Sequence, residues 1–266
     1  ITASEAKNFL GRTPDLITPN GLDIENIPDL AADRKAALKS RKKLLAAATR
    51  FLGRDFPADT RIMLISGRGE FHNKGVDLFL SALGRLNREM GPDQTVIAFI
   101  FVLGDYTDLI PSLKSDDVRP DPGNPPIASH RLRYEASDPI LQACERLGLK
   151  NFPQNRVQII FVPAYLNGHD GFINMTYYEA LAGCDLGVFP SYYEPWGYTP
   201  LESAAYAVPT LTTDQAGFGL WAQQAVGDCN GIILLKRLGQ TEAAIADHLH
   251  AIFRNFLTLP EADVQC

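Results

Sequence analysis

Short, continuously apolar runs recur along the chain and alternate with stretches of helical periodicity. Six of these runs predict β-strands: Ile62–Ser66, Val96–Leu103, Val157–Val162, Leu186–Pro190, Thr210–Thr212 and Ile232–Leu235. Most are apolar at every position rather than at alternate positions. We therefore expect strands that are buried on both faces of a parallel sheet.

The segments between these runs place apolar residues at the spacing of amphipathic helices. They predict helices at Val76–Arg88, Pro139–Leu147, Thr176–Ala182, Pro200–Ala207 and Glu242–Phe256, with an earlier helix near Leu30–Leu52. Strands that alternate with helices over short connections form right-handed βαβ units. The pattern predicts an α/β fold with a doubly wound, mostly parallel, Rossmann-like sheet.

The segment Asp105–Asp138 interrupts this alternation. Its prolines stand among Asp, Ser, Gly and Arg residues, a composition typical of irregular surface segments. We expect a long, partly mobile surface excursion here rather than a linker between two domains.

The composition restricts the classes of function. A hydrophobic content of 45% with 21% charged residues is typical of a globular protein with a sizeable core. A net charge of −6 argues against nucleic-acid partners and against binding to an acidic membrane surface. An anionic ligand would therefore need a local cationic site. No apolar run approaches the roughly 20 residues of a membrane span, and the N-terminus lacks a signal-peptide pattern.

Metal sites and disulfides are not indicated by the sequence. The cysteines lack CxxC spacing and predict reduced thiols of a cytoplasmic protein; they are Cys144, Cys184, Cys229 and Cys266. No Asp-x-Asp pair occurs. The histidines lack ligand spacing as well, since His248 and His250 would face different sides of one helix. We expect no bound metal.

The sequence SYYEPWGYTPLES follows the predicted strand Leu186–Pro190. Pro200 suits the first turn of the next helix, which makes Thr199 the expected N-cap and Glu202 its capping-box partner. Glu194 lies in the connecting loop, at the strand edge where open α/β sheets bind ligands and helix N-termini attract phosphate. Aromatic side chains surround it, and aromatic faces beside carboxylates suit sugars. Glu202 thus has a structural interpretation that Glu194 lacks.

A second group of polar residues follows the predicted strand Ile62–Ser66. Arg68 comes at the end of the strand and Lys74 just before the next helix, so both can reach one ligand at the sheet edge. Fixed cations there stabilise the charge that develops on a departing diphosphate. An isolated surface Arg or Lys is ordinarily solvated, and the G-x-G at Gly67–Gly69 alone is weak evidence for a phosphate site.

The peptide FPSYYEPWGYTPLES closely resembles the signature of glycogen synthases of the animal and fungal type. It contains the E-x7-E pair of many retaining glycosyltransferases with the GT-B architecture of two Rossmann-like domains. Matching stretches include LITPNGLD, SGRGEFHNKGVDLFLSALGRLN and RVQIIFVPAYLN through YYEALAGCDLGVFPS. The resemblance implies that residues 1–266 form the C-terminal nucleotide-sugar-binding domain, one half of a GT-B enzyme whose N-terminal acceptor domain is missing here.

The resemblance also implies roles for the candidate residues. Arg68 and Lys74 would contact the diphosphate of UDP-glucose. Tyr177 would stack on the uracil base, and Glu202 would bind the ribose hydroxyls.

The remaining roles belong to the loop and the helix start. Thr199 and the neighbouring backbone, including Tyr198, would meet phosphate at the helix N-terminus. Glu194 would lie near the transferred glucose and support an oxocarbenium-like transition state, so we count it with Arg68 and Lys74 as catalytic. Gly217, Phe218 and Gly219 resemble the family's TT-x-x-x-GFG element.

The implied reaction is transfer of glucose from UDP-glucose to the non-reducing end of an α-1,4-glucan such as glycogen, with retention and without a metal. We expect these residues alone to bind the donor with little or no transfer. Lys236, Arg237 and Arg254 do not reproduce the spacing of the arginine-rich helix of regulated family members, so no allosteric site is carried over.

Two alternatives stay open at this point. The first is another retaining GT-B transferase, making sucrose, trehalose or a glycolipid, and the second is a non-catalytic nucleotide- or glucan-binding module. The residues do not decide between UDP and ADP, or settle oligomeric state and regulation.

Overall fold

The computed structural model describes residues 1–27, 34–91, 94–115, 117–225, 227 and 231–260. Its main feature is a six-stranded sheet in the order β5-β2-β1-β6-β7-β8, and every neighbouring pair is parallel. The strands are β1 (Arg61–Gly67), β2 (Val96–Val102), β5 (Val157–Phe161), β6 (Leu186–Val188), β7 (Thr210–Thr213) and β8 (Ile232–Leu235). Numbered along the chain within this sheet, the order is 3-2-1-4-5-6, that of dinucleotide-binding folds. The predicted doubly wound sheet is confirmed.

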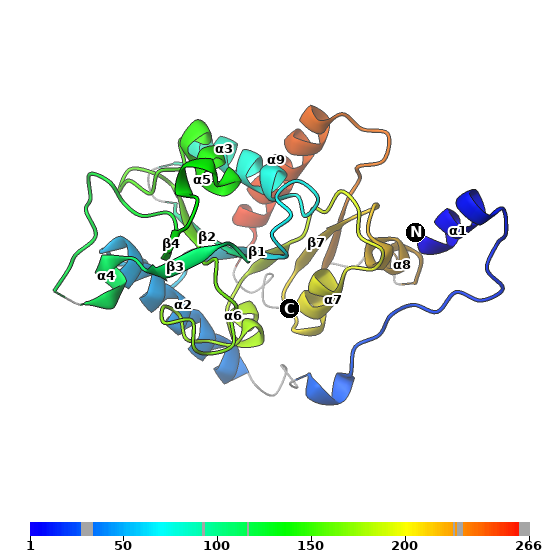
Figure 1. The fold of residues 1–266 in the computed structure, drawn as a ribbon, viewed down its shortest axis with the longest axis horizontal. Coiled ribbons are helices and arrows are strands. Elements are labelled where there is room, and N and C mark those ends of the chain that lie inside the picture. Colours follow the sequence, from blue (N-terminus) through cyan, green and yellow to red (C-terminus); the bar gives the residue numbers. More distant parts are fainter. Residues whose placement is uncertain (28–33, 92–93, 116, 226, 228–230, 261–266) are drawn as a thin grey trace.

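Helices cover both faces of the sheet (Figure 1). The helices are α1 (Thr2–Leu10), α2 (Arg34–Leu52), α3 (Val76–Glu89), α4 (Pro111–Lys114), α5 (Pro139–Leu147), α6 (Tyr177–Ala182), α7 (Tyr198–Ala205), α8 (Gly217–Ala225) and α9 (Glu242–Thr258), with short 3₁₀ turns at Ile24–Asn26 and Glu135–Ser137. α3 packs against α5 and α9 on one face, while α2 packs against α6 on the other. The predicted helix near Leu30–Leu52 corresponds to α2, and its first residues lie outside the described part of the chain.

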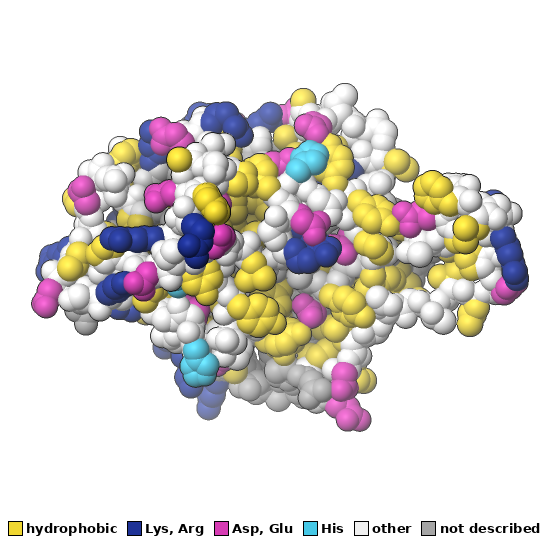
Figure 2. Space-filling view, viewed as in Figure 1, with side chains coloured by type: hydrophobic (Ala, Val, Ile, Leu, Met, Phe, Trp, Pro, Cys, Tyr) yellow, Lys and Arg dark blue, Asp and Glu magenta, His cyan; other side chains and the backbone are white. Residues whose placement is uncertain are grey.

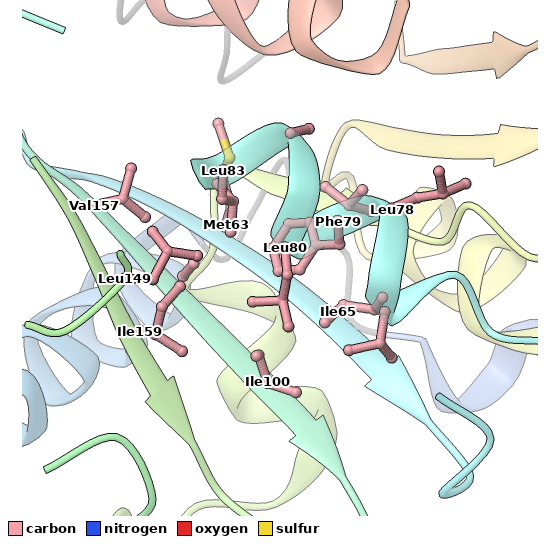
Figure 3. Packing of buried hydrophobic residues seen from close by; sticks show 14 of the residues in the cluster. Met63, Ile65, Leu78, Phe79, Leu80, Leu83, Ile100, Leu149, Val157 and Ile159 are labelled. Carbon is pink, nitrogen blue, oxygen red and sulfur yellow. The ribbon is translucent and has the colours of Figure 1, made fainter. Parts of the chain in front are cut away.

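The sheet is buried on both faces because alternate residues of its central strand join different hydrophobic clusters. Met63 and Ile65 of β1 belong to the cluster beneath α3, α5 and α9, while Ile62 and Leu64 belong to the cluster beneath α2 and α6. Figure 3 shows Met63 and Ile65 together with Phe79 from α3 in the first cluster. This packing explains why the strand sequence is apolar at every position.

The excursion at Asp105–Asp138 contains a small sheet of its own. β3 (Tyr106–Leu109) pairs antiparallel with β4 (His130–Leu132). The adjoining backbone attaches to the edge of the main sheet, since Ser129 N–H donates to Phe161 O at 2.8 Å and Phe161 N–H donates to Ile127 O at 2.8 Å. The excursion therefore covers the edge strand β5.

The N-terminal helix α1 lies at one end of the molecule, beyond α8 (Figure 1), and none of its residues is buried. A hydrogen bond of 2.7 Å runs from the Tyr193 hydroxyl to Oε1 of Glu5 in this helix. Figure 2 shows hydrophobic side chains on this outlying part, and Phe9 and Leu10 are among the exposed ones. No described helix is long and apolar enough to cross a membrane.

Candidate active site

The candidate residues lie where the sheet reverses its strand order. β1 pairs with β2 on one side and with β6 on the other, so the loops that follow β1 and β6 lead to opposite faces. The crevice between such loops is where open α/β sheets bind ligands. Arg68 and Lys74 follow β1, while Glu194 follows β6. In the view of Figure 2, Lys or Arg side chains lie next to acidic ones near the centre of the molecule.

Lys74 and Glu194 form an ion pair that joins the loops after β1 and β6, although they stand 120 positions apart in the sequence. Both are largely shielded, with side-chain exposures of 13% and 18%. An ion pair in such an environment is screened less by water than one on the surface. The Lys74 ammonium, expected to meet a diphosphate, therefore lies on the Glu194 carboxylate.

Backbone contacts hold the two loops together. Tyr192 N–H donates to Asn73 O at 2.8 Å. Gly75 has a positive φ of 73°, and a Cβ at this position would lie 2.3 Å from the carbonyl oxygen of Pro190. Only glycine allows this approach. The close approach at Gly75 thus sets the distance between Lys74 and Glu194.

The backbone of Glu194 is fixed from its other side. Its N–H donates to Gln215 O at 3.0 Å, and its carbonyl accepts from Gly217 N–H at 3.1 Å. Phe218 N–H donates to Trp196 O at 2.7 Å. The element predicted from Gly217, Phe218 and Gly219 thus forms the first turn of α8 and holds the loop that carries Glu194.

Arg68 shares the loop of Lys74 but extends into solvent. Its side chain is 74% exposed, and its Nε lies 3.0 Å from Oε1 of Glu70. Oε2 of Glu70 accepts from the Asn73 amide at 2.7 Å. The structure therefore brings Lys74 and Glu194 into contact and places Arg68 in the same loop as Lys74, with its side chain exposed.

Tyr177 stands at the start of α6, and its hydroxyl lies 3.0 Å from Oγ of Ser66, the residue near the end of β1. Burial raises the pKa of this phenol. The contact places the Tyr177 ring beside the loop that begins at Gly67. The ring of Tyr178 follows at a centroid distance of 5.4 Å.

The predicted capping box of Thr199 and Glu202 is wrong. α7 begins at Tyr198 with Gly197 as its N-cap, at a φ of 101°, and this position makes no side-chain cap. Proline is tolerated throughout a first helical turn, where its missing N–H has no intrahelical partner anyway, so Pro200 did not fix the start.

Glu202 instead accepts a hydrogen bond of 2.9 Å from the Tyr178 hydroxyl. Burial raises the pKa of Glu202, and the bond from Tyr178 partly offsets that rise. Burial, the hydrogen bond and the charge of Glu202 raise the pKa of Tyr178 to about 12. The capping box of this region lies elsewhere, between Thr176 and Glu179 at the start of α6. Tyr198 is exposed and Thr199 half-buried in the first turn of α7.

Arg237 is a component of the site that the sequence prediction missed. It is 4% exposed, its Nη1 donates to Pro190 O at 2.5 Å, and its guanidinium lies 3.7 Å from the ring centroid of Tyr192. The hydroxyl of Tyr192 in turn donates to Glu242. Burial lowers the pKa of Arg237. The sequence did contain a signal, since Arg237 follows β8 closely, much as Arg68 follows β1.

Possible metal ligands and a cavity are the remaining features that could form a site. Within the described residues, no group of three His, Cys, Asp or Glu side chains could hold a metal ion. His248 is exposed and His250 buried, which confirms that they face different sides of α9. A cavity of about 900 Å³ opens between the excursion and α5, and none of the candidate residues lines it.

Comparison with known proteins places this geometry in a family. The chain matches the family model of glycogen synthase over residues 1–121 and 121–260. It is 32% identical to the human liver glycogen [starch] synthase, over 89% of this chain and 42% of the relative. It is 34% identical to the glycogen [starch] synthase isoform 2 of Saccharomyces cerevisiae, over 85% of this chain and 41% of the relative. The chain is 31% identical to the glycogen [starch] synthase of Caenorhabditis elegans, over 96% of this chain and 47% of the relative.

The chain thus spans less than half the length of these relatives. Its fold is similar to the crystal structure of WaaG, a glycosyltransferase involved in lipopolysaccharide biosynthesis, with a TM-score of 0.55 at 19% identity. That alignment covers 98% of this chain and 52% of WaaG, and at this identity it shows the fold alone. The family match extends over nearly the whole sequence and includes both loops of the crevice. The chain therefore belongs to the glycogen synthase family.

Proposed function

We propose that this chain is the donor-binding half of a glycogen synthase. The complete protein would transfer glucose from UDP-glucose to the non-reducing end of an α-1,4-glucan, with retention of configuration. Family membership supports this proposal. The observation that carries it furthest is the contact of Lys74 with Glu194 at the reversal of strand order, because it joins a cation and a carboxylate where a nucleotide sugar would lie.

The first proposed task is to bind and stabilise the diphosphate. Lys74 would contact it from its shielded position between the two loops and Arg68 from the solvent side, where its exposed side chain can fold over a ligand. The N–H groups at the start of α7 would add donors. As the bond to glucose breaks, negative charge grows on the departing diphosphate, and shielded cations stabilise it more than they stabilise the ground state.

The second task is to place the nucleoside and the sugar. The hydroxyl of Tyr177 is held by Ser66, which fixes the ring as a stacking surface for the base. Glu202 would accept from the ribose hydroxyls. Glu194 would face the transferred glucose once the diphosphate draws Lys74 away. The loop bonds at Gln215 and Gly217 keep the Glu194 backbone fixed during that exchange.

The acceptor glucan and the rest of the site would come from an N-terminal half. In GT-B enzymes the donor lies between two domains, so we expect this chain alone to bind nucleotide and to transfer little or no sugar. We further propose a cytoplasmic enzyme that needs no metal.

Burial raises the pKa of the Cys144 thiol to about 12 and raises that of Cys184 as well, which keeps both thiols protonated and unreactive.

Isothermal titration of the folded chain with UDP and, separately, ADP tests this proposal. We expect UDP to bind and EDTA to leave its affinity unchanged. Lys74→Met should weaken binding at least tenfold, because it removes a shielded, charge-assisted contact. Lys150→Met is the matched control, since Lys150 pairs with Glu145 away from the crevice and its loss removes the same charge. No heat of binding at millimolar UDP in a folded sample would overturn the site.

A donor and acceptor screen on the complete protein separates this function from its alternatives. Growth of a glucan from UDP-glucose supports glycogen synthase. Formation of sucrose, trehalose or a glycolipid would identify a different retaining transferase, and binding without any transfer would identify a non-catalytic module.

A further inference from the structure

The carboxylate of Glu202 is held by a residue of another helix. The Tyr178 hydroxyl, on α6, donates to Oε1 of Glu202, on α7, at 2.9 Å. Because donor and acceptor belong to separate helices, the bond fixes the direction of the carboxylate relative to the crevice.

The phenol of Tyr178 is itself held in place. Its ring stacks on that of Tyr206 with a centroid distance of 5.0 Å and an interplanar angle of 8°. The ring of Tyr177 lies at a centroid distance of 5.4 Å from that of Tyr178, and the Tyr177 hydroxyl is hydrogen-bonded to Ser66 near the end of β1. A continuous series of contacts thus runs from the end of β1, through the rings of Tyr177 and Tyr178, to Glu202, and Tyr206 stacks on Tyr178.

This arrangement leaves part of the carboxylate available to a ligand. Among the described residues, Tyr178 is the partner of Oε1, and no side chain or backbone group donates to Oε2. A carboxylate oxygen accepts strongly from hydroxyl groups, and an acidic side chain that bonds the ribose hydroxyls is a recurrent device of nucleotide-binding sheets. Such a device works only if the carboxylate points in one direction.

We propose that Tyr178 is a positioning residue that orients Glu202 toward the ribose hydroxyls, and that it thereby sets a preference for ribonucleotide over 2′-deoxyribonucleotide donors. The inference rests on the proposed function, because it assumes a nucleotide in the crevice. It goes further by assigning sugar selectivity to a hydroxyl that never touches the ligand.

The chain offers a matched pair of variants. Tyr178→Phe keeps the ring and its stack on Tyr206 and removes only the hydroxyl that bonds Glu202. Tyr206→Phe makes the same chemical change on the adjacent ring of the same stack, and within the described residues the Tyr206 hydroxyl makes no hydrogen bond to Glu202. Tyr178 is 42% exposed, so loss of its hydroxyl is expected to leave the fold intact.

The experiment is isothermal titration of each variant with UDP and with 2′-deoxy-UDP. The readout is the dissociation constant for 2′-deoxy-UDP divided by that for UDP. A general loss of stability would not change this ratio. We expect the wild-type chain to prefer UDP and Glu202→Gln to lose most of that preference. Tyr178→Phe should lower the ratio about three- to tenfold, less than the full value of a hydrogen bond to a charged group, because the Glu202 carboxylate is still present and only its orientation is lost. Tyr206→Phe should keep the wild-type ratio.

The outcomes are distinguishable. If wild-type chain binds UDP and prefers ribose, but Tyr178→Phe keeps the full preference or weakens both ligands equally, Tyr178 is not a positioning residue. Equal binding of both ligands by the wild type would likewise overturn the inference while leaving the nucleotide site in place. If the wild-type chain binds neither ligand, the proposed function fails first. Thermal melts of all variants identify any that unfold. If Tyr178→Phe unfolds, Tyr206→Leu is the second test, because it removes the stack but keeps the Tyr178 hydroxyl. We expect it to lower the ratio by less than Tyr178→Phe would.

Discussion

Substitution of Glu194 by Gln should tighten UDP binding while it lowers the stability of the free chain. The change keeps the size of the side chain and removes its negative charge. That charge pairs with the Lys74 ammonium. UDP must draw the ammonium away from Glu194 or share it, and in either case the phosphates approach a carboxylate of like charge.

The expected gain in affinity follows from the geometry of this contact. If one ammonium touches both a carboxylate and a phosphate oxygen, the two anions lie roughly 6 Å apart. At that separation each unit of phosphate charge is repelled by about 0.7 kcal/mol in water and about 1.4 kcal/mol at an effective dielectric constant near 40. Removing the Glu194 charge should therefore tighten UDP binding about three- to tenfold.

The stability of the free chain should move in the opposite direction. Gln can still accept a hydrogen bond from Lys74 but leaves a largely shielded ammonium without its counter-charge, at a cost of about 1–2 kcal/mol. For a protein of this size that corresponds to a lower melting temperature by roughly 2–8 °C. Saturating UDP should abolish most of the difference, because the diphosphate replaces the lost counter-charge.

Isothermal titration and thermal melts of the wild type and Glu194→Gln test this reasoning. Glu145→Gln is the matched control, because it removes the same charge from an ion pair with Lys150 far from the crevice. Unchanged or weaker UDP binding by Glu194→Gln, with a normal control, would refute competition between Glu194 and the diphosphate for Lys74. In the complete protein the same substitution should abolish glucose transfer, and full-rate transfer would refute a catalytic role for Glu194.

Three further predictions follow from the same contacts. Gly75→Ala should lower the free energy of unfolding by about 3 kcal/mol or more in urea titrations. Gly148→Ala is the control, because Gly148 has a similar φ of 72° but nothing within 4 Å of an added Cβ, and it should cost only about 1–2 kcal/mol. Equal costs would show that the approach of Gly75 to Pro190 is not tight. Arg237→Met should cost about 1–2 kcal/mol in the same assay, since it removes the donor to Pro190 and the cation over Tyr192; an unchanged urea midpoint would contradict this. The preference for UDP over 2′-deoxy-UDP should decline as the pH falls through the raised pKa of Glu202, because protonation weakens the carboxyl as an acceptor, and a preference that declines only in the ordinary range of an exposed glutamate would contradict this.

The fold was predictable because its strands are buried on both faces. A run such as Val96–Val102 is apolar at every position and is fully buried in the sheet, so a local pattern carried global information. Strand ends were also predictable, and with them the loops that carry Lys74 and Glu194. The contact between these two side chains was not, because it depends on β1 and β6 being neighbours and on the close approach at Gly75.

The capping box shows where local patterns stop being informative. Thr176 and Thr199 each stand three residues before a Glu, and only the first pair forms the box. At the second, Gly197 allows the helix to begin earlier, and Glu202 finds a donor in Tyr178 from another helix. Sequence spacing alone cannot weigh a local hydrogen bond against a tertiary one. Arg237 was missed for a different reason. The sequence places it after a predicted strand, but no recognised motif includes it, so its role in the site was not predicted.

A crystal structure of this chain with UDP bound tests the central claim most directly. We expect the diphosphate between the loops after β1 and β6, with Lys74 on a phosphate oxygen and no longer on Glu194. The uracil should lie against Tyr177 and the ribose hydroxyls against Glu202. UDP bound elsewhere, for example in the cavity between the excursion and α5, with the Lys74–Glu194 pair intact, would contradict it.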